Sequence, residues 1–307
     1  MEGFRLDTYQ RRLPDSVWFE GFQPGKLFDA FRFRASTAAA MVPGGLTIEY
    51  RFYKSSPRIE LVYQLAKKLE TEPEGVYIAF PFDLQGGSLA FDVQGGEVRP
   101  GIDQLPGSSN DWNTVQTYAR IFDGNRQVVL SSNDIPLMQC GGINTGRYKA
   151  GARPASLKVY SWPINNYWTT NFNAYQFGTH EWMYALTTCS NVSPSFAART
   201  GLENKVPLLS RVIPGGGNDN PADKFSLIEN WPDDVLLISL KPLDDRGNLL
   251  LQVRETAGKS VLFEPRLRVS VPGLKWIRCD ANGNPLLFSY SLLNPFESAF
   301  YKISTEL

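Results

Sequence analysis

The residues best suited to do chemistry gather in one stretch of the sequence, YSWPINNYWTTNFNAYQFGTHEWMYAL at 160–186. Nine of these 27 residues are aromatic and four are Asn, and the only histidine of the chain, His180, stands beside Glu181. Aromatic faces stack on the C–H groups of sugars while amides bond their hydroxyls, so this composition fits a sugar platform. The alternatives are a catalytic site and a well-packed pair of strands.

A second stretch mixes polar and aromatic residues in the same way, VRPGIDQLPGSSNDWNTVQTYARI at 98–121. Its carboxylates, amides and Trp112 could line a cleft for a polyol. The alternative is structural, since tryptophans are common in cores and Asn is a frequent turn former.

Nucleophilic and metal chemistry find little support in the side chains available. A Ser-His-Asp triad would have to use His180, and the chain has no GxSxG elbow. Zinc and iron sites need several converging His, Cys or carboxylate ligands, which one histidine cannot complete. A packed structural role is therefore favoured for His180, and we expect no metal ligands in this chain.

Paired carboxylates could hydrolyse a glycoside, because that reaction needs two carboxyl groups about 5–10 Å apart. Several carboxylates lie near the ends of expected strands, but the sequence does not pair them: Asp83, Asp92, Glu97, Asp103, Asp111 and Asp134. We therefore assign no catalytic residue.

Charge and cysteine content narrow the class of protein. Lys plus Arg is 31 and Asp plus Glu is 31, so the basic excess typical of nucleic-acid binders is missing. The three cysteines lie far apart without CxxC spacing, which predicts buried thiols rather than a disulfide framework. No signal-like segment and no run of about 18 apolar residues occurs, so we expect a cytoplasmic protein that makes no membrane contact.

The sequence pattern around these residues predicts β-strands. Short runs alternate apolar and polar residues between Gly, Pro, Asn and Asp, as in stacked antiparallel sheets. The runs before residue 190 are 46–54, 58–68, 75–84, 88–93, 113–122, 126–132, 157–164 and 180–188. The best helix candidate is 195–204, ending near Gly201. The first 44 residues show no clean strand set and predict an irregular or truncated lead-in.

A break in composition divides the chain. VIPGGGNDNPADKF at 212–225 contains three consecutive glycines and two prolines, which predicts a linker. Six further alternating runs follow, so we predict a large β-domain over 1–211 and a small β-sandwich over 226–307. The expected fold class is all-β.

Several of these segments, in order, resemble one family. YRFYKSSPRIELVYQLAKK, EGVYIAFPF, GGEVRPGIDQLPGSSNDW, NDIPLMQCGGI and YSWPINNYWTTNF are similar to the C-terminal β-domain of glycoside hydrolase family 38, the α-mannosidases. The segment NPFESAFYKI resembles the closing strand of the same enzymes. The resemblance implies a large antiparallel supersandwich, like that of galactose mutarotase, followed by a smaller β-sandwich.

The resemblance also implies an activity, the retaining hydrolysis of α-mannosides with a zinc ion and an Asp nucleophile. In the family those residues belong to an N-terminal α/β barrel, to which no part of this chain corresponds. None of the catalytic or zinc positions can be carried over. We therefore expect the non-catalytic half of such an enzyme, encoded separately, truncated or surviving as a remnant, and inactive by itself. It would support or bind an α-mannoside beside a catalytic barrel that acts in trans or has been lost, and zinc would belong to that barrel.

Two loops are the expected contacts with carbohydrate, DQLPGSSNDW at 103–112 and NNYWTTNF at 165–172. The candidate residues are Asp103, Gln104, Asn110, Trp112, Asn165, Asn166, Trp168 and Asn171. Competing hypotheses are a freestanding carbohydrate-binding protein, a purely structural β-protein and a sugar epimerase. The epimerases of this fold use two histidines, and this chain has one.

Overall fold

The structure is a computed structural model that describes residues 9–144, 153–166, 175–206, 208–212, 226, 228–268, 274–287 and 291–304. The chain forms two compact units. The first comprises Met1–Val93, Glu97–Val192 and Thr200–Lys205, and the second Gln94–Gly96, Ser193–Arg199 and Val206–Leu307. Each is described by itself.

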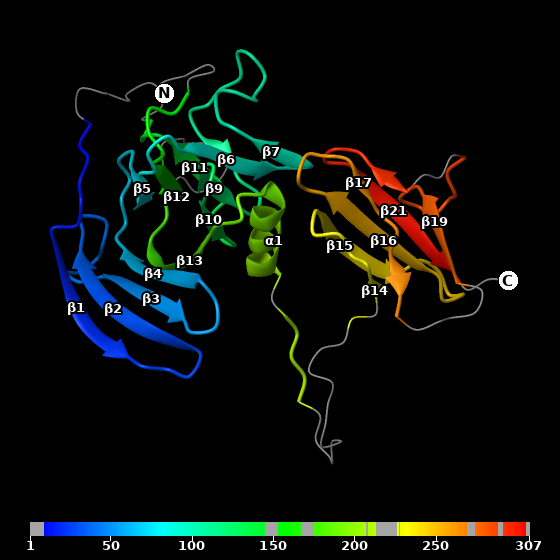
Figure 1. The fold of residues 1–307 in the computed structure, drawn as a ribbon. Coiled ribbons are helices and arrows are strands. Elements are labelled where there is room, and N and C mark those ends of the chain that lie inside the picture. The colour runs from blue at the N-terminus through cyan, green and yellow to red at the C-terminus, as the bar shows by residue number, and fades with distance from the viewer. Residues whose placement is uncertain are drawn as a thin grey trace. The chain divides into compact units, whose positions relative to one another are not determined.

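A nine-stranded sheet is the main element of the first unit, and the pairings recorded between its neighbouring strands are antiparallel. Strands β1 to β4 follow one another in chain order at one end, as Figure 1 shows. From that end the strands are β1 (Ser16–Gln23), β2 (Phe28–Ser36), β3 (Leu46–Tyr53), β4 (Arg58–Lys67), β13 (Gly178–Cys189), β10 (Gln127–Ser132), β9 (Ala119–Phe122), β6 (Ser88–Val93) and β7 (Gly96–Val98).

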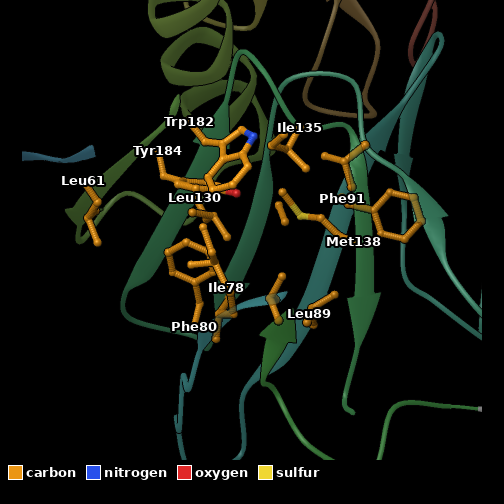
Figure 2. Packing of buried hydrophobic residues seen from close by; sticks show 14 of the residues in the cluster. Leu61, Ile78, Phe80, Leu89, Phe91, Leu130, Ile135, Met138, Trp182 and Tyr184 are labelled. Carbon is orange, nitrogen blue, oxygen red and sulfur yellow. The ribbon is translucent and has the colours of Figure 1, made fainter. Parts of the chain in front are cut away.

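A four-stranded sheet packs against the middle of the large sheet. Its strands are β5 (Gly75–Phe80), β12 (Val159–Asn165), β11 (Leu137–Cys140) and β8 (Asn113–Thr114). Alternate side chains of both sheets meet in one apolar cluster, where Phe80 and Met138 lie among Leu130 and Tyr184 (Figure 2). The Tyr184 hydroxyl donates to Ser161 Oγ at 2.8 Å, which joins the two layers through a polar contact.

The chain changes sheets between β8 and β9. The sequence predicted one strand over 113–122, and this is wrong, because residues 115–118 form a corner. The buried carboxylate of Asp92 accepts hydrogen bonds from the backbone N–H groups of Gln116, Thr117 and Tyr118 at 2.9–3.1 Å. Those donors are thereby satisfied inside the protein without a strand partner. Burial raises the pKa of Asp92.

Two regular strands replace the irregular lead-in expected over the first 44 residues. β1 and β2 pair with each other, and β2 pairs with β3. The expectation was wrong because Trp18 and Phe19 are both apolar but point to opposite faces of β1. That arrangement obscures the period-two alternation from which strands were inferred.

The predicted helix is confirmed as α1 (Pro194–Lys205). It begins with proline at the first helical position, and Ser193 Oγ accepts from the N–H of Ser195 at 3.2 Å. We had expected the helix to end near Gly201, but it continues to Lys205. The role of Gly201 is close approach, because a Cβ there would lie 2.6 Å from Thr117 Oγ1.

The second unit contains a four-stranded antiparallel sheet in the order β15 (Val235–Pro242), β16 (Leu249–Glu255), β21 (Ser298–Ser304) and β19 (Lys275–Cys279). Phe263 packs on Trp231 and Tyr301 in its core. Short pairs complete it: β14 (Ile228–Glu229) with β18 (Arg266–Leu267), and β17 (Val261–Leu262) with β20 (Leu292–Leu293).

These elements confirm the all-β fold class, with antiparallel sheets and sandwich packing in the described part of the chain. The predicted linker at 212–225 lies, except for Val212, outside the described residues. The boundaries 1–211 and 226–307 therefore remain a prediction.

Candidate functional site

The loop between β7 and β8 carries four of the eight residues predicted to contact carbohydrate. Asp103 closes its first turn by accepting from Arg99 N at 2.8 Å and from Arg99 Nε at 2.9 Å. These bonds from Arg99 hold the pKa of Asp103 below its usual range. The carboxylate of Asp103 is thus occupied in shaping the loop.

Gln104 has a similar structural role. Its Oε1 accepts from Gly101 N at 2.8 Å, and its Nε2 donates to Asn113 Oδ1 at 3.0 Å. Gly101 has a φ of 69°, which a side chain rarely adopts. Gln104 therefore anchors the loop to the buried start of β8.

Trp112 ends the loop and belongs to a row of three aromatic rings. Its ring meets that of Trp162 at a tilt of 63°, with centroids 5.9 Å apart. Trp162 in turn stacks on Tyr77 of β5 at 5.5 Å and 12°. Trp162 is 3% exposed whereas Trp112 is 37% exposed. Trp112 thus packs on a buried ring while remaining partly exposed itself.

Polar side chains lie beside Trp112 and hold the same region together. Asp111 Oδ1 accepts from Asn144 Nδ2 at 2.7 Å, and the Asn144 N–H donates to Gln139 Oε1 at 2.6 Å. All three side chains are buried. Asn110, another predicted contact, precedes this network and is partly buried. These bonds therefore hold in place the segment that carries Trp112.

The second predicted loop is only partly described, since Trp168 and Asn171 lie outside the described residues. Asn166 is buried, and its Nδ2 donates to the carbonyls of Glu70 at 3.1 Å and Glu72 at 2.8 Å. Its Oδ1 accepts from Glu74 N. Asn166 is thus a clamp for the segment before β5.

Asn165 ends β12 opposite Gly75, three residues beyond Trp162. Strand β12 therefore links the two loops, although the described residues do not converge on one cleft.

His180 and Glu181 do not form a pair. As neighbours in β13 they point to opposite faces of the large sheet, and Glu181 accepts from Gln64 Nε2 at 2.6 Å. The His180 ring stacks on Trp182 at 6.1 Å and 4°. The packed role favoured for His180 fits this geometry, and no acid–base pair results.

One pocket was not predicted from the sequence. A cavity of about 500 Å³ lies where β5 ends and β12 begins, lined by residues 82–87 and 154–158. Asp83, Gln85, Ser156 and Lys158 supply polar groups to its wall. The only sequence signal was the Gly86-Gly87 turn, in which Gly86 has a φ of 71°.

Metal binding has no ligand set in the described ranges. No group of three or more His, Cys, Asp or Glu side chains there is arranged to hold a metal ion. The zinc implied by the family resemblance therefore does not fit these residues. Across the same ranges, no helix is long and apolar enough to cross a membrane.

Two solved structures share this fold. An α-mannosidase from Enterococcus faecalis V583 superposes with a TM-score of 0.69 and 12% identity, over 94% of this chain and 35% of its own. A protein in glycosyl hydrolase family 38 from Enterococcus faecalis gives 0.69 and 10%, over 94% of this chain and 37% of its own. No family model matches the chain. No curated protein matches it either.

At this identity the likeness shows the fold alone. The chain spans little more than a third of the length of those two structures.

Proposed function

We propose that this chain is the non-catalytic β-region of an α-mannosidase-like glycoside hydrolase, which works beside a catalytic body and contributes to holding an α-mannoside. The observation that carries the proposal is the asymmetric match: 94% of this chain is covered, against 35% and 37% of the two similar structures. In this proposal the matching part is the C-terminal β-region of those proteins and the remaining length carries the chemistry.

The geometry of the first unit favours a structural role over a catalytic one. Asp103, Gln104 and Asn166 direct their side chains to backbone groups or to neighbouring side chains. His180 and Glu181 face opposite sides of a sheet. Such groups shape loops with precision, which a domain needs in order to present a surface to a partner.

Trp112 is the residue through which the region would touch sugar. Its accessible ring is fixed against Trp162, so little conformational entropy is lost when a sugar stacks on it. Asp111 and Asn144 are buried and bonded to each other, so they hold the loop in place while Trp112 supplies the sugar contact. An α-mannoside is the expected ligand in view of the family resemblance.

A second candidate function follows from the same residue. If the Trp112 surface binds sugar without any catalytic partner, the chain is a freestanding carbohydrate-binding protein. The partial exposure of Trp112 favours sugar contact under either hypothesis, whereas the partial match in length favours the first.

Titration of the purified chain with methyl α-mannoside, followed by calorimetry or by tryptophan fluorescence, tests the sugar contact. We expect a dissociation constant on the order of 1 mM, because a single ring and a few hydroxyl bonds offset the cost of association only modestly. Methyl α-galactoside serves as the matched control. An equal response to both sugars would remove the preference for an α-mannoside, and a response to neither would remove the carbohydrate part of the proposal and leave a scaffold role.

A further inference from the structure

The pocket where β5 ends and β12 begins is separate from the Trp112 contact. It holds about 500 Å³ between residues 82–87, which follow β5, and residues 154–158, which precede β12. A volume of this order is typical of small-molecule sites. The described residues that line it do not include Trp112 or Trp162, so a ligand bound here would occupy a site of its own.

Apolar side chains from both segments give the pocket a fixed inner surface. Phe82, Leu84 and Leu157 line the pocket and pack against the buried cluster. The ring of Phe82 stacks on that of buried Phe80, with centroids 6.1 Å apart and an angle of 14°. The core therefore holds an aromatic ring at the pocket, on which the C–H groups of a sugar can stack.

Backbone contacts keep both walls of the pocket in place. The Gly87 N–H donates to the Leu84 carbonyl at 2.8 Å, and a Cβ on Gly87 would lie 3.0 Å from Leu157 Cδ1. On the other wall, Ser156 Oγ donates to the Gly141 carbonyl at 2.9 Å. A ligand would therefore meet a pocket that is already formed, which lowers the entropic cost of binding.

The polar side chains of the wall are available to a ligand. Asp83, Gln85 and Lys158 are exposed, and their side chains have no hydrogen-bond or ion-pair partner among the described residues. One negative and one positive charge leave this wall without net charge, which favours neither an anion nor a cation. A carboxylate accepts from hydroxyls, an ammonium group donates to them, and an amide does both. The set therefore fits a neutral ligand with several hydroxyls.

We propose that this pocket is a second carbohydrate site, which takes an α-mannoside oligosaccharide of about two or three rings. A single methyl glycoside would fill only part of the pocket and bind too weakly to measure, because affinity grows with the number of ligand atoms in contact. The class of ligand follows from the residues of the pocket, whereas the choice of mannose rests on the proposed function.

Calorimetric titration of the full-length Trp112→Ala chain with α-linked mannotriose tests this site. The alanine removes the ring proposed for the first sugar contact, so the remaining binding reports on the pocket. We expect a dissociation constant on the order of 1 mM. Added salt should leave it unchanged, because the ligand is neutral. Methyl α-mannoside and the wild-type chain test the Trp112 contact separately, so failure of one site is distinguishable from failure of the other.

Variants of the pocket are made in the same Trp112→Ala background. Lys158→Met and Asp83→Ala each remove a polar contact and should weaken mannotriose binding by about fivefold. Ala155→Trp fills the pocket and should abolish binding. All three side chains are exposed, so the variants should fold. Lys26→Met is the matched control, since Lys26 is an exposed lysine outside the pocket, and it should bind mannotriose unchanged.

Methyl NMR locates the bound sugar. The methyl signals of Leu84 and Leu157, which line the pocket, should shift as mannotriose is added to the Trp112→Ala chain. Those of Leu105, which is 81% exposed in the loop before β8, should not move.

The absence of mannotriose binding by the Trp112→Ala chain would overturn the proposal. Binding that persists unchanged in both Lys158→Met and Ala155→Trp would equally overturn it. A response to the zwitterion glycylglycine in place of mannotriose would also do so, because recognition would then depend on the charges of Asp83 and Lys158 and not on hydroxyls.

Discussion

Trp112 and Trp162 meet edge to face, with ring centroids 5.9 Å apart, so that a buried tryptophan fixes the orientation of a partly exposed one. Replacing Trp112 by alanine removes the accessible ring while leaving Trp162 on Tyr77. We expect Trp112→Ala to abolish measurable binding of methyl α-mannoside in a calorimetric titration. Trp112→Phe should retain part of it, because a smaller ring still stacks.

The matched control for Trp112 is Trp18→Ala, since Trp18 is similarly exposed but lies on β1. Binding should be unchanged in that variant. If Trp112→Ala binds the sugar as the wild-type chain does, Trp112 is a packing residue only.

Asp103 provides a test by pH. Arg99 holds the folded-state pKa of Asp103 below the ordinary value of 3.8, so the unfolded state binds a proton at higher pH than the folded state. The stabilisation is therefore present above pH 3.8 and is lost as pH falls through the lower folded pKa. Both side chains are partly exposed, which limits the effect to about 1 kcal/mol or less.

We expect Asp103→Asn to lower the free energy of unfolding at pH 7 by that small amount in urea titrations. The difference from the wild-type chain should shrink as pH falls below 3.8 and vanish below the lowered folded-state pKa. A difference that is constant with pH would mean that the hydrogen-bond geometry, and not the charge, explains the loss.

Asn166 offers a test of the clamp before β5. In Asn166→Asp the amide donor to the carbonyls of Glu70 and Glu72 becomes a carboxylate oxygen, which repels them in a buried site. We expect the free energy of unfolding to fall by about 2–3 kcal/mol. Asn125→Asp in an exposed turn should change it by less than about 0.5 kcal/mol. Equal effects of the two substitutions would contradict the clamp.

A buried ion pair secures β9 to β7. Arg120 Nε and Nη2 lie 2.6 and 2.7 Å from the two carboxylate oxygens of Glu97, and Arg120 Nη1 donates to the Val192 carbonyl at 2.9 Å. Arg120→Met leaves the carboxylate of Glu97 without its cation, and we expect a loss of about 3–5 kcal/mol in unfolding free energy.

Arg126→Met is the control for Arg120, because the ion pair of Arg126 with Asp123 is exposed and screened by water, so its loss should change the unfolding free energy far less. The double variant Glu97→Gln with Arg120→Met should recover part of the loss. A loss below 1 kcal/mol in Arg120→Met would show that the pair adds little.

The strands that follow a clear apolar–polar alternation could be predicted from sequence, because burial of one face selects that pattern. β3 and β4 begin at the predicted residues, and β13 includes the predicted run. β1 could not be found this way because apolar residues stand on both of its faces. The corner at 115–118 depends on Asp92, which lies more than twenty residues away in the sequence.

The candidate site was less predictable for a related reason. Composition indicated which side chains could bind sugar, yet their hydrogen-bond partners decide whether they are available. The partners of Asn166 lie over ninety residues away, and only the folded chain shows that it holds a loop. Trp112 is partly exposed and packs on Trp162, which in turn stacks on Tyr77, and the sequence shows neither contact.

The central claim, that this region does not itself hydrolyse α-mannosides, is tested most directly by incubating the purified chain with an aryl α-mannoside and added zinc, and repeating the assay with a chelator. We predict no turnover above the buffer rate in either condition. Turnover that the chelator abolishes would contradict the account, since it would require a metal site in a chain that has a single histidine.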